Sequence, residues 1–189
     1  ISGSYSKVHL VPFGEYVPLQ KFLPFIQKLT AQSGDFFPGE KGSILWFGKG
    51  GAGVQICFEV IFPGLSRAMV KNGAKLLVNI TNDAWFGTSS APYQHFSMVK
   101  FRAVENKRAV ARAANTGISG FIDPVGRVVA QTGLYEDRQL TRSLPLADTL
   151  TFYTRYGDVF LLFCLPMLIP AALSFRASGK GSKAGKHSK

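Results

Sequence analysis

Two polar side chains lie on apolar segments, where a hydrophobic core would normally contain only apolar side chains. Cys57 ends the predicted strand Gly53–Cys57, and Lys7 begins the predicted strand Lys7–Val11. A thiol at the end of a strand, next to a helix start, suits a nucleophile, because backbone N–H groups there favour the thiolate and can stabilise an oxyanion. Taken alone, such a cysteine is more often a small buried hydrophobe. Burial of an unpaired ammonium is costly, so Lys7 must reach solvent or a carboxylate, and Glu15 is the nearest candidate.

A second polar cluster follows another apolar run, in the segment Asn79-Ile80-Thr81-Asn82-Asp83-Ala84-Trp85-Phe86-Gly87. Polar residues and then an aromatic pair after a buried strand are typical of a loop that binds ligands. Trp85 and Phe86 could equally form the packed edge of a core.

Metal and disulfide chemistry are not expected. The three histidines (His9, His95 and His187) lack the spacing of metal ligands and have no cysteine beside them, so no metal is predicted and no cofactor is implied. Cys164 lies within the uncharged apolar run 159–175, for which a membrane position is predicted below; a disulfide with Cys57 would require the strand that ends at Cys57 to reach that run, and we reject it.

The elements that must position these residues alternate between apolar runs and amphipathic stretches, which indicates a layered α/β domain. The pair Val125-Gly126 after Asp123-Pro124 marks a hairpin turn, so we expect a mixed sheet. The predicted strands are Lys7–Val11, Gly53–Cys57, Leu76–Ile80, Ala109–Ala113 and Gly120–Ile122, and the predicted helices are Pro18–Leu29, Pro63–Asn72 and Pro92–Asn106.

Composition adds a membrane segment to this domain. The chain has 46% hydrophobic and only 17% charged residues, which excludes a disordered protein. The run 159–175 carries no charged side chain, and it is followed by a basic, Gly- and Ser-rich tail that holds much of the +11 net charge. We therefore predict a domain at 1–150, a transmembrane helix with its interfacial lead-in at 151–175 and a flexible cytoplasmic tail at 176–189. A buried core helix is the alternative for the apolar run. Because the chain opens with Ile1, we expect it to be a fragment.

Four segments in this order resemble the nitrilase-like domain of bacterial apolipoprotein N-acyltransferases. They are KVHLVPFGEYVP from Lys7, ICFEVIFP from Ile56, NITNDAWFG from Asn79 and the stretch from Gln94 to Gly126. The resemblance implies an α-β-β-α sandwich, here partial, that faces the periplasm and belongs to a multi-pass protein of the inner membrane.

The resemblance also implies a Glu–Lys–Cys triad, with Cys57 as nucleophile and Lys7 as the oxyanion-stabilising cation. The N–H of Phe58 would complete the oxyanion site. Glu15 and Glu59 match supporting carboxylates, and Trp85 with Phe86 matches a mobile aromatic loop that covers or contacts the lipid substrate. The triad Glu lies well before the Lys in this family, so we expect it to be absent from this chain and the chain alone to be inactive.

The implied reaction moves an acyl chain from a phospholipid, typically phosphatidylethanolamine, to Cys57 as a thioester. The chain then passes to the N-terminal amine of a diacylglyceryl-cysteine lipoprotein. Membrane lipid and apolipoprotein would be the partners, without nucleic acid. One alternative is a membrane-tethered amidase or nitrilase-type carbon–nitrogen hydrolase that uses the same triad. The other is a basic module that binds membrane surfaces, in which Cys57 and Lys7 have no catalytic role.

Overall fold

The computed structural model describes residues 3–12, 14–16, 36–164, 166 and 170. The chain divides into two units, Ile1–Arg155 and Tyr156–Lys189. The helix predicted at Pro18–Leu29 and the tail predicted at 176–189 lie outside the described residues, so both stay predictions.

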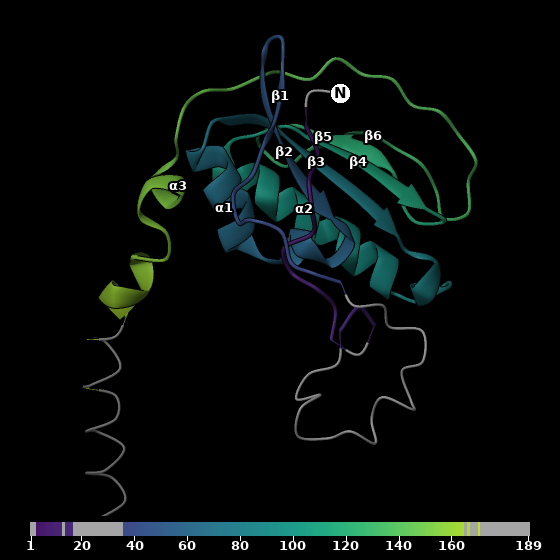
Figure 1. Ribbon diagram of the computed structural model, residues 1–189, viewed down its shortest axis with the longest axis horizontal. Coiled ribbons are helices and arrows are strands. Elements are labelled where there is room, and N and C mark those ends of the chain that lie inside the picture. Colours follow the sequence, from purple (N-terminus) through teal and green to yellow (C-terminus); the bar gives the residue numbers. More distant parts are fainter. Residues whose placement is uncertain (1–2, 13, 17–35, 165, 167–169, 171–189) are drawn as a thin grey trace, which may run out of the picture. The chain divides into compact units, whose positions relative to one another are not determined.

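The first unit is built on one mixed six-stranded sheet with the order β1-β2-β3-β4-β5-β6 (Figure 1). The strands are β1 (Leu45–Phe47), β2 (Gly50–Ile56), β3 (Ala74–Asn82), β4 (Val110–Asn115), β5 (Gly120–Ile122) and β6 (Val128–Gln131). The central pairs β2–β3 and β3–β4 are parallel, whereas β1–β2, β4–β5 and β5–β6 are antiparallel. The expected α/β class and mixed sheet are therefore confirmed, and the turn at Gly126, with φ of +84°, joins β5 to β6.

Two helices connect the parallel strands and cover one face of the sheet (Figure 1). Helix α1 (Pro63–Lys71) leads from β2 to β3, and helix α2 (Ala91–Asn106) leads from β3 to β4. Proline stands in the first turn of each helix, where its missing N–H costs nothing. Both predicted helices are confirmed to within a residue at each end. The core between helices and sheet is apolar and contains Leu65, Met69, Val70, Leu77, Phe96, Val99, Ala103, Val110 and Ile122.

The opposite face of the sheet is also apolar but only partly covered. Val78 and Ile80 alternate with the buried Leu77 and Asn79 along β3, and the side chain of Ile80 is 44% exposed. A strand with apolar residues on both faces is normally buried on both faces. Among the described residues no helix or second sheet lies over this side, which is the side that a sandwich partner would cover.

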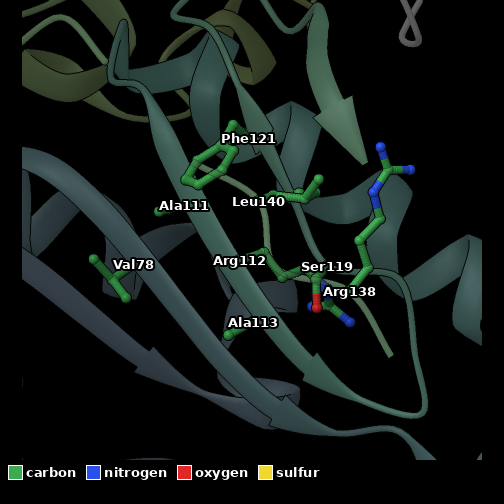
Figure 2. A pocket seen from close by; sticks show the side chains of 9 residues that line it. Val78, Ala111, Arg112, Ala113, Ser119, Phe121, Arg138 and Leu140 are labelled. Carbon is green, nitrogen blue, oxygen red and sulfur yellow. The ribbon is translucent and has the colours of Figure 1, made fainter. Parts of the chain in front are cut away.

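Figure 2 shows a hollow of about 250 Å³ on this open face. Val78, Ala111 and Phe121 form its floor, and Leu140 and Arg138 border it from the segment that follows β6. Cys57 and Lys7 are not among its lining residues, so the hollow belongs to the open face of the sheet rather than to the predicted site.

The segment 132–151 has neither helix nor strand and runs from the end of β6 to α3 (Phe152–Tyr156) (Figure 1). It is attached by an ion pair of 2.8 Å between Lys75 Nζ and Asp148 Oδ1, and by a 2.7 Å hydrogen bond from Arg108 to the carbonyl oxygen of Thr149. Arg108 is only 1% exposed, and burial lowers its pKa. The buried guanidinium therefore anchors the segment against the sheet.

The predicted strand Lys7–Val11 is wrong, because these residues form irregular backbone. The N–H groups of Val8 and His9 donate to the carboxylate of Glu59, and the N–H of Val11 donates to Glu15. Backbone donors that are satisfied by side chains do not need a neighbouring strand, so the apolar pattern of this segment reflects burial without a sheet.

Among the described residues, no helix combines the length and the apolar character that crossing a membrane requires. Residues 160–164 are helical, but much of the predicted span at 151–175 lies outside the described residues. The transmembrane helix therefore stays a prediction.

Candidate active site

Cys57 lies at the sharp turn between β2 and the short 3-10 helix η2 (Cys57–Ile61). Its φ is +56°, a left-handed conformation that costs a residue with a side chain about 1–3 kcal/mol. The sequence pattern predicted Cys57 as the last residue of the strand, and the structure instead makes it the first residue of the helix. The side chain is partly exposed and both cysteines are free thiols, as a nucleophile at this position requires.

Glu59 follows Cys57 in η2 and is completely buried. One carboxylate oxygen accepts hydrogen bonds from the N–H groups of Val8 at 2.5 Å and His9 at 3.1 Å. The other accepts from the Tyr5 hydroxyl at 3.0 Å and from the N–H of Ile56 at 2.7 Å. Burial, together with the nearby Glu59 charge, raises the pKa of Tyr5 well above its usual value. Glu59 therefore joins the segment at residues 5–9 to the turn that carries Cys57.

Lys7 lies on that attached segment and forms a close ion pair with Glu15. Its Nζ is 2.6 Å from Oε1 and 2.8 Å from Oε2 of Glu15. The Lys7 side chain is only 10% exposed, so the carboxylate offsets much of the cost of burying the ammonium. An ammonium has three N–H donors, so this pair leaves at least one for a ligand.

A hollow of about 410 Å³ lies beside this segment. Its lining is largely apolar and comprises Val8, His9, Leu10, Tyr16, Phe36 and Pro38. The ring of His9 stacks on Phe62 with 4.2 Å between the ring centroids, which holds one wall of the hollow against the residue that precedes α1.

A buried polar cluster contacts the carbonyl oxygen of Cys57. The cluster consists of four residues that are each at most 5% exposed, namely Asn79, Asp83, His95 and Arg112. Arg112 donates to Asp83 Oδ2 at 2.7 Å and to Asn79 Oδ1. His95 Nδ1 lies 3.0 Å from Asp83 Oδ1, and His95 Nε2 lies 3.2 Å from the carbonyl oxygen of Cys57.

The ion pair within this cluster is reflected in two pKa shifts. Burial of Asp83 acts to raise its pKa, but the hydrogen bond from His95 and the charge of Arg112 outweigh burial, so the pKa of Asp83 falls below its usual value. Burial lowers the pKa of Arg112, and the charge of Asp83 and its hydrogen bond with Arg112 oppose that effect. The Asp83 carboxylate is thus held ionised by its neighbours.

Sequence reasoning did not assign a role to this cluster. From the sequence, His95 is a candidate only as a metal ligand, and Asp83 only as part of a polar loop. Arg112 offered a usable signal, because a charged residue on an otherwise apolar strand must find a buried partner. Within the described residues, no three His, Cys, Asp or Glu side chains gather in a way that could hold a metal ion.

The two aromatic residues that follow β3 have different surroundings: one is exposed to solvent, and the other contacts the buried polar cluster. Trp85 and Phe86 lie in the 3-10 helix η3 (Ala84–Phe86), and the Trp85 side chain is 85% exposed. Phe86 meets the ring of His95 edge to face at 5.8 Å. Trp85 is therefore not part of a packed core edge, whereas Phe86 packs on the cluster behind Cys57.

The structure thus places a free thiol at the turn after β2, and a lysine paired with Glu15, on an α/β domain with a mixed sheet. The carbon–nitrogen hydrolase family model matches residues 1–152, and the chain belongs to this family.

The known proteins to which the chain is similar include apolipoprotein N-acyltransferases from several bacteria. It is 54% identical to the enzyme of Geobacter metallireducens, over 93% of this chain and 34% of that protein. It is 40% identical to the enzyme of Chlorobaculum tepidum, over 85% of this chain and 32% of that protein. The chain thus spans about a third of the length of these relatives. Saccharomyces cerevisiae Nit3, a member of branch 10 of the nitrilase superfamily, is a similar solved structure, with a TM-score of 0.48 and 28% identity over 54% of this chain and 40% of Nit3.

Proposed function

We propose that this chain is part of an apolipoprotein N-acyltransferase, in which Cys57 carries the acyl group as a thioester. The observation that carries the proposal is the 54% identity to the Geobacter metallireducens enzyme across 93% of the chain. The match to the carbon–nitrogen hydrolase family covers residues 1–152, which include the Cys57 turn and the Lys7–Glu15 pair.

In the proposed first step, the Cys57 thiolate attacks the ester carbonyl of a phospholipid, typically phosphatidylethanolamine. A carboxylate base from the rest of the full-length protein takes the thiol proton. The Lys7 ammonium and the Phe58 N–H stabilise the oxyanion, and the bond to the glycerol oxygen breaks as that oxygen takes up a proton. The products are a thioester on Cys57 and a lysophospholipid.

In the second step, the N-terminal amine of a diacylglyceryl-cysteine lipoprotein attacks the thioester. The C–S bond breaks, an amide forms, and the amine loses a proton as the Cys57 thiol is restored. A thioester suits this exchange because it keeps the acyl group activated between the two substrates. The apolar hollow of about 410 Å³ beside Lys7 suits a hydrocarbon chain better than a polar substrate.

The supporting residues have proposed roles that follow from their contacts. Glu15 holds the Lys7 ammonium in place, and Glu59 orders the loop after Cys57. The exposed Trp85, next to Phe86, contacts lipid or closes over the site.

The full-length protein is proposed to be a multi-pass protein of the inner membrane, with this domain in the periplasm. The run 159–175 would span the membrane and the tail at 176–189 would be cytoplasmic. The open apolar face of the sheet supports an α-β-β-α sandwich, because a second sheet there would cover Val78, Ile80 and Phe121.

The experiment uses the full-length membrane protein with a phospholipid that carries a labelled acyl chain. Wild-type protein is expected to form a hydroxylamine-sensitive thioester, and Cys57→Ala is expected to form none. Cys164→Ala is the matched control, because it removes the other cysteine of the chain and should leave labelling unchanged.

Two results would contradict the proposal. Labelling of the Cys57→Ala protein would exclude Cys57 as the acyl carrier and favour a module that only binds membrane. Hydrolysis of short amides without labelling by phospholipid would favour the alternative, a membrane-tethered amidase or nitrilase-type carbon–nitrogen hydrolase.

A further inference from the structure

The carbonyl oxygen of Cys57 is held from within the domain by two buried side chains. His95 Nε2 lies 3.2 Å from this oxygen, and Asn79 Nδ2 donates to it at 3.4 Å. A carbonyl oxygen carries no hydrogen, so Nε2 of His95 must be the donor in its contact. Both donors come from the buried polar cluster, on the side of the Cys57 backbone where β3 and α2 lie.

The two donors are themselves held in one orientation by charged partners. A guanidinium only donates, so the contact from Arg112 fixes the Asn79 side-chain oxygen toward Arg112 and turns the amide nitrogen toward Cys57. The Asp83 carboxylate lies 3.0 Å from His95 Nδ1, which directs the other ring nitrogen at the same carbonyl. Asp83 in turn accepts from Arg112 at 2.7 Å, so one buried ion pair sets the direction of both donors.

The same peptide group contains the N–H of Phe58. A trans peptide is planar, and its C=O and N–H point in opposite directions. A carbonyl of Cys57 that is directed into the buried cluster therefore directs the Phe58 N–H away from it. Hydrogen bonds to the carbonyl also polarise the peptide and strengthen its N–H as a donor. The positive φ of Cys57 is a strained conformation, and such strain persists only where surrounding contacts maintain it.

We propose that His95 and Asn79, oriented by Asp83 and Arg112, are positioning residues that aim the Phe58 N–H at the oxyanion of the acyl-transfer intermediate. This inference rests on the proposed function only in taking Cys57 as the acyl carrier and the Phe58 N–H as an oxyanion donor. None of the four side chains touches the substrate, and their effect passes through the peptide between Cys57 and Phe58.

The test separates oxyanion stabilisation from the reactivity of the thiol. Acylation of Cys57 by a p-nitrophenyl ester passes through an oxyanion, whereas alkylation by iodoacetamide requires only an accessible thiolate. Both rates are measured on the full-length protein. The variants are His95→Ala, His95→Gln, whose amide can donate to the Cys57 carbonyl, and the control Thr154→Val, which removes buried hydrogen bonds to Asn106 and Thr151 away from Cys57.

His95→Ala is expected to lower kcat for acylation by roughly ten- to a hundredfold, short of the full loss of an oxyanion donor, with little change in KM. The alkylation rates of His95→Ala and of Thr154→Val should both stay close to the wild-type rate. His95→Gln should recover most of the wild-type acylation rate. Equal losses of acylation and alkylation in His95→Ala, an unchanged acylation rate, or an equal loss in Thr154→Val would overturn the inference.

The ester also separates this inference from the proposed function. If wild-type protein is acylated by the p-nitrophenyl ester but not by phospholipid, the acyltransferase proposal fails while the positioning role is still decided by the variants. If Cys57 is acylated by neither substrate, both proposals are overturned.

Discussion

Glu59→Gln is the change that tests most directly how the Cys57 turn is held to the Lys7 segment. Each carboxylate oxygen of Glu59 accepts two hydrogen bonds, from Val8 and His9 on one side and from Tyr5 and Ile56 on the other. An amide keeps one acceptor oxygen and replaces the other with an NH₂ group, which faces two donors.

The size of the effect follows from those four contacts. Hydrogen bonds to charged groups contribute about 1.5–3 kcal/mol each, so the loss of two predicts a destabilisation of about 3–6 kcal/mol. Glu59 is completely buried, so solvent does not screen this loss. A change of that size is a large fraction of the stability of an ordinary domain, roughly 5–15 kcal/mol.

The assay combines thermal unfolding of the full-length protein with amide hydrogen exchange at Val8 and His9. We expect a lower unfolding temperature and faster exchange at both amides, because the segment can separate from η2. Glu40→Gln is the matched control, since it makes the same chemical change at an exposed carboxylate and should stay within about 0.5 kcal/mol of wild type. Wild-type stability and unchanged exchange in Glu59→Gln would refute the idea that this carboxylate holds the two segments together.

Three further predictions concern the neighbouring groups. Glu15→Gln should lower acylation of Cys57 by more than about tenfold with a smaller loss of stability, because the nearly buried Lys7 ammonium loses its charged partner while part of Glu15 is solvated; an equal rate in a thioester assay would contradict this. The pKa of Asp83 is depressed in the folded protein, so its contribution to stability is present above the pKa of an unfolded Asp, about 3.9, and is lost as the pH falls through the lower folded value. The stability difference between wild type and Asp83→Asn, measured by denaturant titration, should therefore be constant near neutral pH and shrink below about pH 4; a constant difference down to pH 2 would show that folding does not lower the pKa of Asp83. Trp85→Ala should change stability by less than about 0.5 kcal/mol because its side chain is 85% exposed, yet it should slow acylation by phospholipid more than acylation by a short ester; equal effects on the two acyl donors would exclude a lipid contact.

Much of the first unit could be predicted from local pattern. The apolar runs at Leu76–Ile80 and Ala109–Ala113, and the helices predicted to begin at Pro63 and Pro92, appear in the structure with small shifts at their ends. Each of these elements buries one face, and the geometry of a strand or helix fixes the spacing of the residues on that face. The pattern of apolar residues can therefore be recognised from neighbouring positions in the sequence. Cys57 and Lys7 could also be singled out from the sequence. A thiol and an ammonium on apolar segments need a polar partner or a functional role in any fold that buries those segments.

Only the tertiary structure decided how the site is held together. The segment Lys7–Val11 has a strand-like composition, but its N–H groups donate to Glu59 and Glu15, and no local pattern shows that a distant carboxylate will take the place of a sheet partner. The cluster that meets the Cys57 carbonyl joins β3, α2 and β4, and its side chains become partners only when those elements pack. Local sequence determines which surfaces a segment must bury, whereas hydrogen bonds between buried polar groups depend on which segments the fold brings together.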